Sequence, residues 1–531
     1  MENKSTTGSK IAKSTLAIVV FSLIGKIFGF ARESLTAYVF GTSIEMDAFS
    51  LAQAATAMIA GFVTQAIATT YIPSVQKAET ELGHERKNYF TNNLLMISSL
   101  VSFIIIGLGI LFPEQIALLS ASQADPKTYA IVAKLIQVGM PVVLFSSWVG
   151  VLTGYLQHGG KFAAAGAIAI PLNLTYIVYL ALFSHHIGII GLTIASVLGI
   201  LVQFIFLLPS AFKIGYRPQF ILDFHDKYVR DAIVLALPVF ISVSVNDVNT
   251  IVNRNLASGM GQGAASILYF ANKMNTMIIG VFITAITAIV FPILTRTLGS
   301  GDMDRGKKVM NASIKSVLFL TVPATIGMII LARPIIEIAF VRGSFTQADG
   351  IAATSTLRFY SLSLISISLS NVLNRIFYSI EDTKTPFYIG VVNVLLNVGL
   401  NLAVAKHYGT NGLAASVSIA TTVAVIISFI LLRKKIGNLG TKSFVKALIK
   451  TAMASIAMGI VALSYFPYEK LILTFASGGL ATLLKLIALM IVVAIAAVIY
   501  VICLYYLGVR EIRDVVGIMK RKIELKKASK A

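Results

Sequence analysis

Residues 25–49 read GKIFGFARESLTAYVFGTSIEMDAF and combine two apolar helical segments with four charged side chains. Lys26, Arg32, Glu33 and Asp47 lie in or beside segments that are otherwise apolar enough to span a bilayer. An ionisable side chain at membrane depth costs at least ~2.5–3.5 kcal/mol, so it normally faces a watery cavity, a partner or a substrate. Glu33 is interpreted as an interfacial residue, whereas Lys26 lies too deep to reach the interface easily. The stretch therefore predicts a membrane protein with charged groups in its interior.

The composition of the whole chain indicates the same class. Of its 531 residues, 56% are hydrophobic and only 13% are charged, about half the charged share of a soluble protein. Apolar runs long enough for a helical span recur throughout, without the alternation of barrel strands, so an all-α polytopic fold is predicted. The single Cys503 excludes a disulfide framework and a cysteine-ligated metal site. The first apolar run has no small-residue cleavage site and is expected to remain as a span.

Hydropathy predicts fourteen transmembrane helices. They are expected at residues 11–31, 45–72, 90–112, 127–156, 162–183, 187–212, 230–256, 264–294, 309–332, 348–378, 386–405, 410–432, 445–465 and 479–507. Lys and Arg gather on the loops that share a side with the two termini, so the positive-inside rule predicts that both termini are cytoplasmic. The net charge of +21 is thus a membrane-surface feature and does not indicate a nucleic-acid partner.

Two blocks of sequence repeat at nearly one offset. A shift of 219 residues aligns Asp47–Pro73 with Ser266–Pro292, and a shift of 221 aligns His186–Leu192 with His407–Leu413. The second pair shares the form His-x-Gly-x-x-Gly-Leu; the histidines are interpreted as loop residues and the glycines as tight turns that open the next span. A duplication is therefore predicted. Because each copy holds six spans, an even number, the copies are expected to be parallel repeats.

The duplication predicts four segments. Residues 1–213 form an N-terminal lobe of spans 1–6, residues 214–434 form a C-terminal lobe of spans 7–12, residues 435–508 hold spans 13–14, and residues 509–531 form a basic cytoplasmic tail. The tail is expected to be solvated or attracted to anionic lipid.

The segments GKIFGFARE (25–33) and FGTSIEMDAF (40–49) resemble the N-terminal signature of the MurJ (MviN) family of lipid II flippases, in the MOP exporter superfamily. The resemblance implies a MATE-like pair of lobes, with spans 13–14 bordering a groove for the lipid tail. It also implies functional roles for Lys26, Arg32 and Asp47. The chain departs from the family pattern in residues 52–74, where family members commonly carry basic residues and this sequence has none.

A second matching segment, YFANKMNT (269–276), implies a functional basic residue at Lys273. Lysine keeps the charge of the family's usual arginine but loses its bidentate fork. The alternative is that Lys273 pairs with Asp247 to fix helix packing. The predicted substrate-binding residues are Lys26, Arg32, Asp47, Asn272, Lys273, Arg358 and Arg375.

The resemblance also suggests a coupling-ion site, because some family members have a sodium site in the second lobe. Span 7, SVSVNDVNTIVNRNLASG, is far too polar to face lipid, and hard cations take oxygen ligands. The candidate ligands are Asp247, Asn249, Asn253, Asp382, Asn393 and Asn397. The same side chains could instead hydrogen-bond between helices. Apart from a coupling Na⁺, no cofactor is expected.

The predicted function is that of a flippase. A cationic interior suits the diphosphate of a lipid-linked saccharide, and the resemblance implies that lipid II moves from the inner to the outer leaflet of a bacterial cytoplasmic membrane by alternating access. A flippase for another undecaprenyl-diphosphate-linked oligosaccharide, such as a teichoic acid or capsule unit, is the first alternative. A drug or cation exporter of the same superfamily would require an acidic or aromatic cavity, and a non-transporting scaffold would not need buried charge.

Enzyme motifs are absent from the sequence, which contains no Walker loop, HExxH or GxSxG. The chain is therefore predicted to be a transporter and not an enzyme. Its expected partners are lipid II and membrane lipids, and it is expected to be a monomer.

Overall fold

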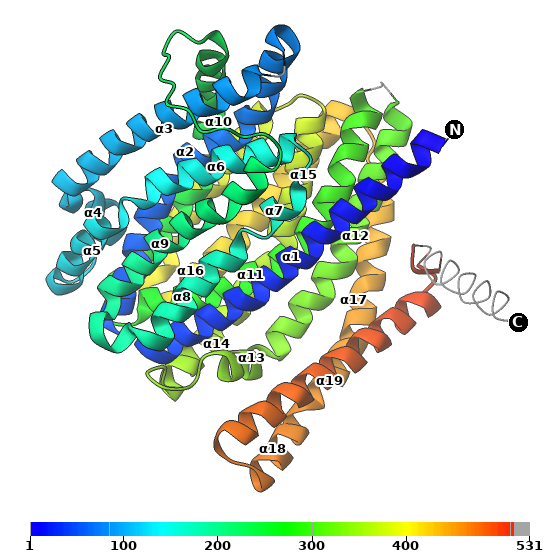
Figure 1. The fold of residues 1–531 in the computed structure, drawn as a ribbon. Helices are drawn as coiled ribbons and strands as arrows, with labels where there is room; N and C mark the ends of the chain where they lie inside the picture. The colour runs from blue at the N-terminus through cyan, green and yellow to red at the C-terminus, as the bar shows by residue number, and fades with distance from the viewer. Residues whose placement is uncertain (1, 84, 300–301, 510, 514–531) are drawn as a thin grey trace, which may run out of the picture. The chain divides into compact units, whose positions relative to one another are not determined.

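The computed structural model describes residues 2–83, 85–299, 302–509 and 511–513, and every regular element in these ranges is a helix (Figure 1). The helices are α1 (Glu2–Phe40), α2 (Ile44–Leu82), α3 (Arg86–Leu111), α4 (Pro113–Ala121), α5 (Pro126–Gly139), α6 (Val142–His158), α7 (Phe162–Gly166), α8 (Ala169–Leu182), α9 (Ser184–Phe212), α10 (Lys227–Ser258), α11 (Ala264–Gly299), α12 (Met303–Ile330), α13 (Ala332–Ala339), α14 (Gln347–Ser361), α15 (Ser363–Ser379), α16 (Lys384–Ile436), α17 (Thr441–Leu463), α18 (Tyr465–Phe475) and α19 (Gly478–Tyr506).

Several of these helices are long and apolar enough to cross a bilayer. Within the described residues eight segments meet that description, or up to nine when α5 and α6, which are bent by 43° at their junction, form one span. The predicted all-α polytopic class is thereby confirmed. The count of fourteen spans stays a prediction.

Two glycines break long helices at positions related by the repeat. Gly188 in α9 has φ 62° and ψ −146°, and Gly409 in α16 has φ 55° and ψ −139°. This backbone conformation is accessible to glycine because it lacks a Cβ atom. The two residues are 221 positions apart, the offset found in the sequence. The break at Gly409 separates predicted spans 386–405 and 410–432, which lie within the single helix α16.

The described chain packs as two compact units. Unit one comprises Met1–Phe270, Arg342–Asp349 and Val394–Leu413, and unit two comprises Ala271–Val341, Gly350–Asn393 and Ala414–Ala531. Each unit has a core of its own. In unit one the core includes the buried side chains of Tyr71, Phe90 and Tyr155. The predicted lobe boundary between residues 213 and 214 stays a prediction.

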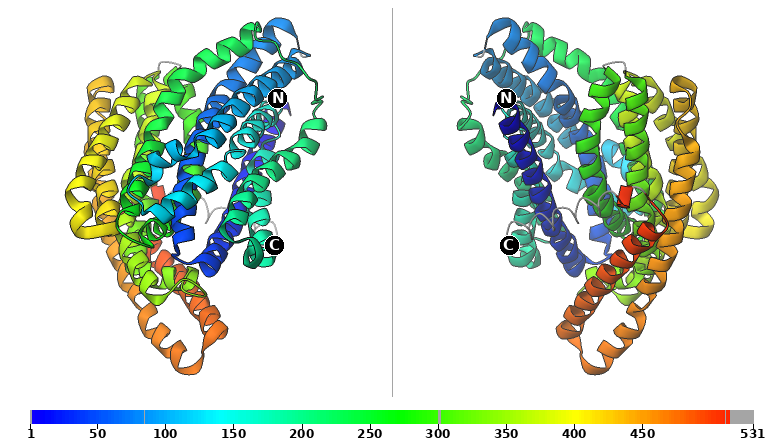
Figure 2. Two further views of the ribbon diagram at one scale, coloured as in Figure 1. Left: turned by 90° about the vertical axis from the view of Figure 1, so that its left-hand side faces the viewer. Right: turned by 90° about the vertical axis from the view of Figure 1, so that its right-hand side faces the viewer.

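The helices of predicted spans 13–14 belong to unit two. Figure 2 shows α17 and α19, in orange and red, running beside each other. Phe319 of α12, Met458 of α17 and Tyr500 of α19 share one buried cluster, and the Tyr500 hydroxyl donates a hydrogen bond to the Phe319 carbonyl at 2.7 Å. Most of α19 remains exposed and apolar, which suits a helix that faces lipid.

Candidate functional site

Arg32 on α1 is buried in an arginine–tyrosine cluster in unit one. Its guanidinium donates to the Glu33 carboxylate and lies 4.8 Å from the centroid of the Tyr176 ring. The Tyr269 hydroxyl donates to the same carboxylate at 3.1 Å. Glu33 is only 4% exposed, so its interpretation as an interfacial residue was wrong. The error has a physical reason, because Tyr269 comes from α11 and its approach cannot be read from α1 alone.

Arg254 on α10 completes this cluster. Its guanidinium lies 5.2 Å from the Tyr269 ring centroid and donates to the Ser50 carbonyl at 2.5 Å. Arg254 is 8% exposed and follows Arg32 by 222 residues, so the two arginines occupy corresponding places in the repeat. The predicted substrate-binding residues lacked Arg254 and both tyrosines, although Arg254 could be recognised from the sequence as one of the charges of the polar span 7.

Asp47, one of the predicted site residues, belongs to the first turn of α2. Its carboxylate lies at the N-terminus of α11. Its carboxylate accepts hydrogen bonds from the backbone N–H of Gly263 at 2.6 Å and of Ser266 at 2.7 Å. The Ser266 hydroxyl donates to the same carboxylate at 2.5 Å. A carboxylate in this place satisfies otherwise unpaired N–H groups and is favoured by the helix dipole. Asp47 therefore joins the start of α2 to the start of α11. Ser266 is also the residue that the 219-residue offset aligns with Asp47.

The end of α1 is fastened by residues 342–349. Thr42 donates to Asp349 at 2.7 Å, the Ser344 N–H donates to the Tyr38 carbonyl at 2.9 Å, and Arg342 donates to the Ser34 hydroxyl. Gly343 permits the close approach, because a Cβ atom there would lie 2.4 Å from the Tyr38 carbonyl oxygen. We call this set of contacts the first clasp.

A second clasp fastens the end of α10 in a corresponding way. The Asn255 side-chain oxygen accepts from the Ser122 hydroxyl and the Gln123 N–H, each at 3.2 Å. Residues 123–125 and 347–349 both read QAD. This match, at an offset of 224, was missed in the sequence and would have indicated both clasps.

An asparagine cluster joins α10 to α16 in unit one. Asn401 donates to Asn253 at 2.7 Å and to Asn397 at 3.0 Å, and Asn253 donates to the Asn249 carbonyl at 2.9 Å. Asn397 and Asn401 are fully buried, and the Asn397 amide nitrogen and Asn401 amide oxygen lack a partner within the described structure. Three predicted cation ligands, Asn249, Asn253 and Asn397, are thus brought together, and Asn401 joins them. Asn401 could have been found from its four-residue spacing after Asn397.

The other predicted ligands differ in their surroundings. Asp247 is half-buried, and its carboxylate faces Gly61 of α2. Asn393, in unit two, carries a buried amide oxygen without a hydrogen-bond partner in the described part of the chain. Asp382 instead pairs with Lys435 at the end of α16. Burial alone would raise the pKa of Asp382, but hydrogen bonds from Lys435 and Thr385 outweigh it and hold the pKa below its ordinary value.

Lys26 is half-buried on α1 beside a close helix contact. Asn173 of α8 donates to the Gly25 carbonyl at 3.1 Å, and a Cβ atom on Gly25 would lie 2.9 Å from that of Ala169. Among the residues that the structure describes, no carboxylate pairs with Lys26.

The remaining predicted residues belong to unit two. Asn272 and Lys273 are half-buried on α11. Arg358 is exposed and donates to the Ile329 carbonyl at 3.3 Å. Arg375 on α15 is exposed as well. The accessible charge in this unit therefore includes two arginines on α14 and α15.

Comparison with known proteins gives one consistent family. The family model described as "Lipid II flippase MurJ" matches residues 36–477. A probable lipid II flippase MurJ from Rickettsia prowazekii is 26% identical over 464 residues, covering 86% of this chain and 91% of that protein. Its counterpart from Vibrio cholerae is 28% identical over 472 residues, covering 85% and 89%.

Solved structures agree on the fold. A lipid II flippase MurJ in an inward closed conformation superposes with a TM-score of 0.72 at 23% identity, covering 91% of this chain and 98% of that one. A multidrug resistance MATE family transporter of the MOP superfamily gives 0.68 at 13% identity, with coverage of 80% and 99%. The match to the family model spans most of the sequence and the fold agrees with it, so the chain belongs to the lipid II flippase MurJ family.

Proposed function

We propose that this protein moves lipid II from the inner to the outer leaflet of the bacterial cytoplasmic membrane. Family membership supports the substrate class. The observation that carries the proposal is Lys26, a half-buried cation in a predicted span with no carboxylate partner among the described residues. A cation at that depth requires an anion or water, and the diphosphate of the lipid head would supply the anion.

The arginine–tyrosine cluster would act beside Lys26. Arg32 and Arg254 hold their guanidiniums against tyrosine rings, with Glu33 as the neighbouring carboxylate. A charged group fixed in this way keeps its orientation while substrate exchanges. In the proposed mechanism Lys26 of unit one contacts the diphosphate head. Lys273, Arg358 and Arg375 are the candidate cations of unit two.

Asp47 and the two clasps would form the gate. By the predicted topology they lie at the external ends of α1, α2 and α10, and they would hold that side closed while the cytoplasmic side is open. Release of these hydrogen bonds would then accompany opening to the outside. The internal correspondence of the arginines, glycine breaks and clasps supports the proposed pair of parallel six-helix repeats, residues 1–213 and 214–434.

A coupling ion would use the asparagine cluster. Asn249, Asn253, Asn397 and Asn401 supply amide oxygens of the kind that hard cations bind. Of the six residues predicted as cation ligands, Asp382 fits the site least well, because Lys435 already neutralises its carboxylate. Na⁺ is therefore proposed at the α10–α16 cluster. Asp247 lies two residues before Asn249 on α10, so it points to another face of the helix, toward Gly61 of α2, and it is left out of the proposed site.

The test is complementation of a bacterial strain depleted of its own lipid II flippase. Arg32→Ala, Asp47→Ala and Lys273→Ala should each abolish growth support. Lys273→Ala should still accumulate in the membrane, whereas Arg32→Ala should accumulate less, because it removes the guanidinium that pairs with the buried Glu33 carboxylate. Lys273→Arg should retain it, because the charge remains. Full activity of both Arg32→Ala and Lys273→Ala would contradict the cationic mechanism.

A vesicle assay separates the alternatives. Protein reconstituted into vesicles should translocate fluorescent lipid II faster than an undecaprenyl-diphosphate-linked oligosaccharide of another kind. Preference for the second lipid would indicate the first alternative, and transport of a small organic cation in place of either lipid would indicate an exporter.

A further inference from the structure

An apolar cavity of about 580 Å³ lies within unit one. Three long helices form most of its wall, which Ile116 of α4 and Met140 complete. α2 contributes a stripe from Ile59 to Thr70, α3 contributes a stripe from Leu94 to Leu108, and α10 adds residues around Ile233. The spacing of three and four residues along α2 and α3 places each stripe on one face of its helix.

The polar side chains of the cavity wall do not need a hydrogen-bond partner from a ligand. Its two hydroxyl groups are already used within their own helices, since Thr70 donates to the Ala66 carbonyl at 2.7 Å and Ser98 donates to the Leu95 carbonyl at 3.0 Å. The apolar wall therefore offers no hydrogen bonds that would hold water in the cavity. Because α2 and α3 are membrane spans, a hydrocarbon chain is the available occupant.

The dimensions of the cavity fit a single acyl chain. The α3 stripe covers fourteen residue steps, which is ~21 Å at 1.5 Å per residue. One leaflet is half of a hydrocarbon core ~30 Å thick, so the stripe is long enough to hold an acyl chain of one leaflet. At ~30 Å³ for a water-sized group, the cavity holds roughly 19 such groups. One phospholipid acyl chain has about this size, whereas the much longer polyprenyl tail of lipid II would not fit.

Cationic side chains follow the apolar stripes at one end. On α10, Arg230 precedes Ile233 by three residues and therefore shares its face. Arg230 is exposed, and no carboxylate of the described residues pairs with it. On α2, Lys77 follows Thr70 by two turns and lies 3.2 Å from Asp231.

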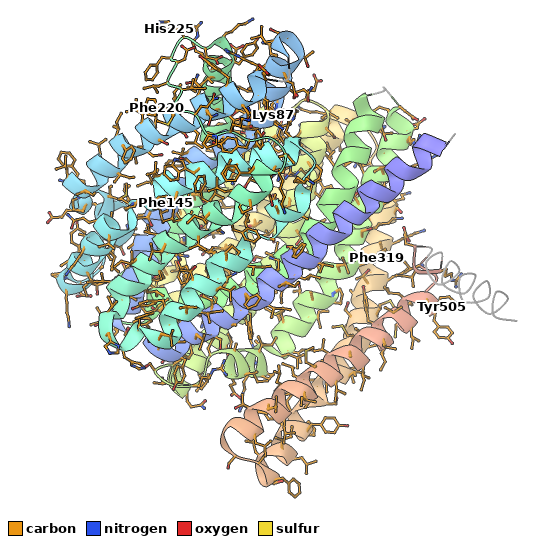
Figure 3. The ribbon with its side chains drawn as sticks, in the orientation of Figure 1. Lys87, Phe145, Phe220, His225, Phe319 and Tyr505 are labelled. Atoms are coloured by element: carbon orange, nitrogen blue, oxygen red, sulfur yellow. The ribbon has the colours of Figure 1, made fainter. Side chains whose placement is uncertain are left out.

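The same end carries signs of a membrane interface. The loop of residues 213–226 lies over the first turns of α3, where Asn88 donates to the Gly215 carbonyl and Asn93 to the Asp223 carbonyl, each at 2.8 Å. This loop presents Phe220, labelled in Figure 3, which is 81% exposed. Exposed aromatic side chains beside basic residues are typical of the headgroup level.

We propose that the cavity among α2, α3 and α10 binds one acyl chain of an anionic phospholipid whose phosphate lies at Arg230 and Lys77. This site is separate from the residues proposed for the lipid-linked saccharide. It would seat a membrane lipid against the face where α2 meets α10. Basic residues near the membrane surface attract anionic lipid, so the chain and the phosphate would act together.

The experiment measures lipid retention by native mass spectrometry. Full-length protein in mild detergent is incubated with phosphatidylglycerol and washed. Wild-type protein should retain one phosphatidylglycerol. Ala66→Phe, which fills the cavity, should retain at least tenfold less, whereas Ala68→Phe, on the exposed side of α2, should match wild type. On α3, Val101→Phe and Ile104→Phe form a second pair, because Val101 lines the cavity and Ile104 does not.

The headgroup is tested on α10. Arg230→Gln should weaken retention of phosphatidylglycerol several-fold and leave phosphatidylcholine unchanged, while Lys227→Gln should have no such effect. Three results would overturn the proposal: no retained phospholipid on wild type, equal retention by the Ala66 and Ala68 variants, or displacement of phosphatidylglycerol by polyprenyl phosphate from wild type.

Discussion

The interpretation of Glu33 changes once its neighbours in the fold are known. In the sequence it is a polar residue near a helix end, but in the fold it is the buried partner of Arg32 and accepts a hydrogen bond from Tyr269. Breaking a buried ion pair by removing one partner typically costs 3–5 kcal/mol, because the other charge is left uncompensated.

Glu33→Gln should therefore reduce both the accumulation and the flipping activity of the protein, since Arg32 would lose its counter-charge. Complementation and membrane abundance measure the two effects. Glu45→Gln is the matched control, because Glu45 is exposed in the first turn of α2. If Glu33→Gln behaved like that control, the ion pair would have no energetic role.

At this scale the sequence predicted the charged residues better than their partners. Lys26, Arg32 and Asp47 could be identified because charge is rare in apolar helices. Their contacts come from Tyr176, Tyr269 and the start of α11, which are distant in sequence. No local pattern carries that information.

Among the elements, α16 shows most clearly what apolar runs predict and what they miss. The two spans expected at 386–405 and 410–432 were divided by a glycine-containing turn, and the backbone departs from helical geometry at Gly409. Residues 127–156 were expected to form one span, and they comprise α5 and α6, which are bent by 43° at their junction. Hydropathy is uniform across such a bend, so a prediction from hydropathy cannot locate it.

Gly409→Ala should lower the thermal stability of the purified protein, because its φ of 55° with ψ −139° costs a residue with a Cβ atom on the order of 1–3 kcal/mol. Gly399→Ala, in the same helix with open space around it, should have no effect or raise the melting temperature. Equal effects of the two substitutions would argue against a strained break.

The Asp382–Lys435 pair predicts a pH effect at the start of α16. Because the pKa of Asp382 is held below its ordinary value, its stabilising contribution is complete above the unfolded-state pKa and is lost as pH falls through the folded-state value. Lys435→Gln removes the main group that lowers this pKa, so it should lower the melting temperature at about pH 6 and flatten its decline toward about pH 3. Melting temperatures measured from about pH 6 down to about pH 3 test this, with Lys434→Gln as the control.

For the whole molecule, the distribution of Lys and Arg predicts orientation. In a protein whose Cys503 is replaced by Ser, a cysteine at Gln347 should react with an impermeant thiol reagent added to intact cells, and one at Asp304 should not. Both positions are exposed in the fold, so accessibility depends on the side of the membrane alone. Reaction at Asp304 from outside would reverse the predicted topology.

The contact between Asp47 and Ser266 has a consequence for ancestry. These residues are equivalents in the two copies, yet they touch, with the serine hydroxyl and two backbone N–H groups meeting one carboxylate. In a dimer of two identical half-length chains, this place would hold either two aspartates or two serines. Two carboxylates at such a distance cannot both ionise easily. The acid–hydroxyl pairing thus requires two halves that differ at this position, and two identical half-length chains could not form it.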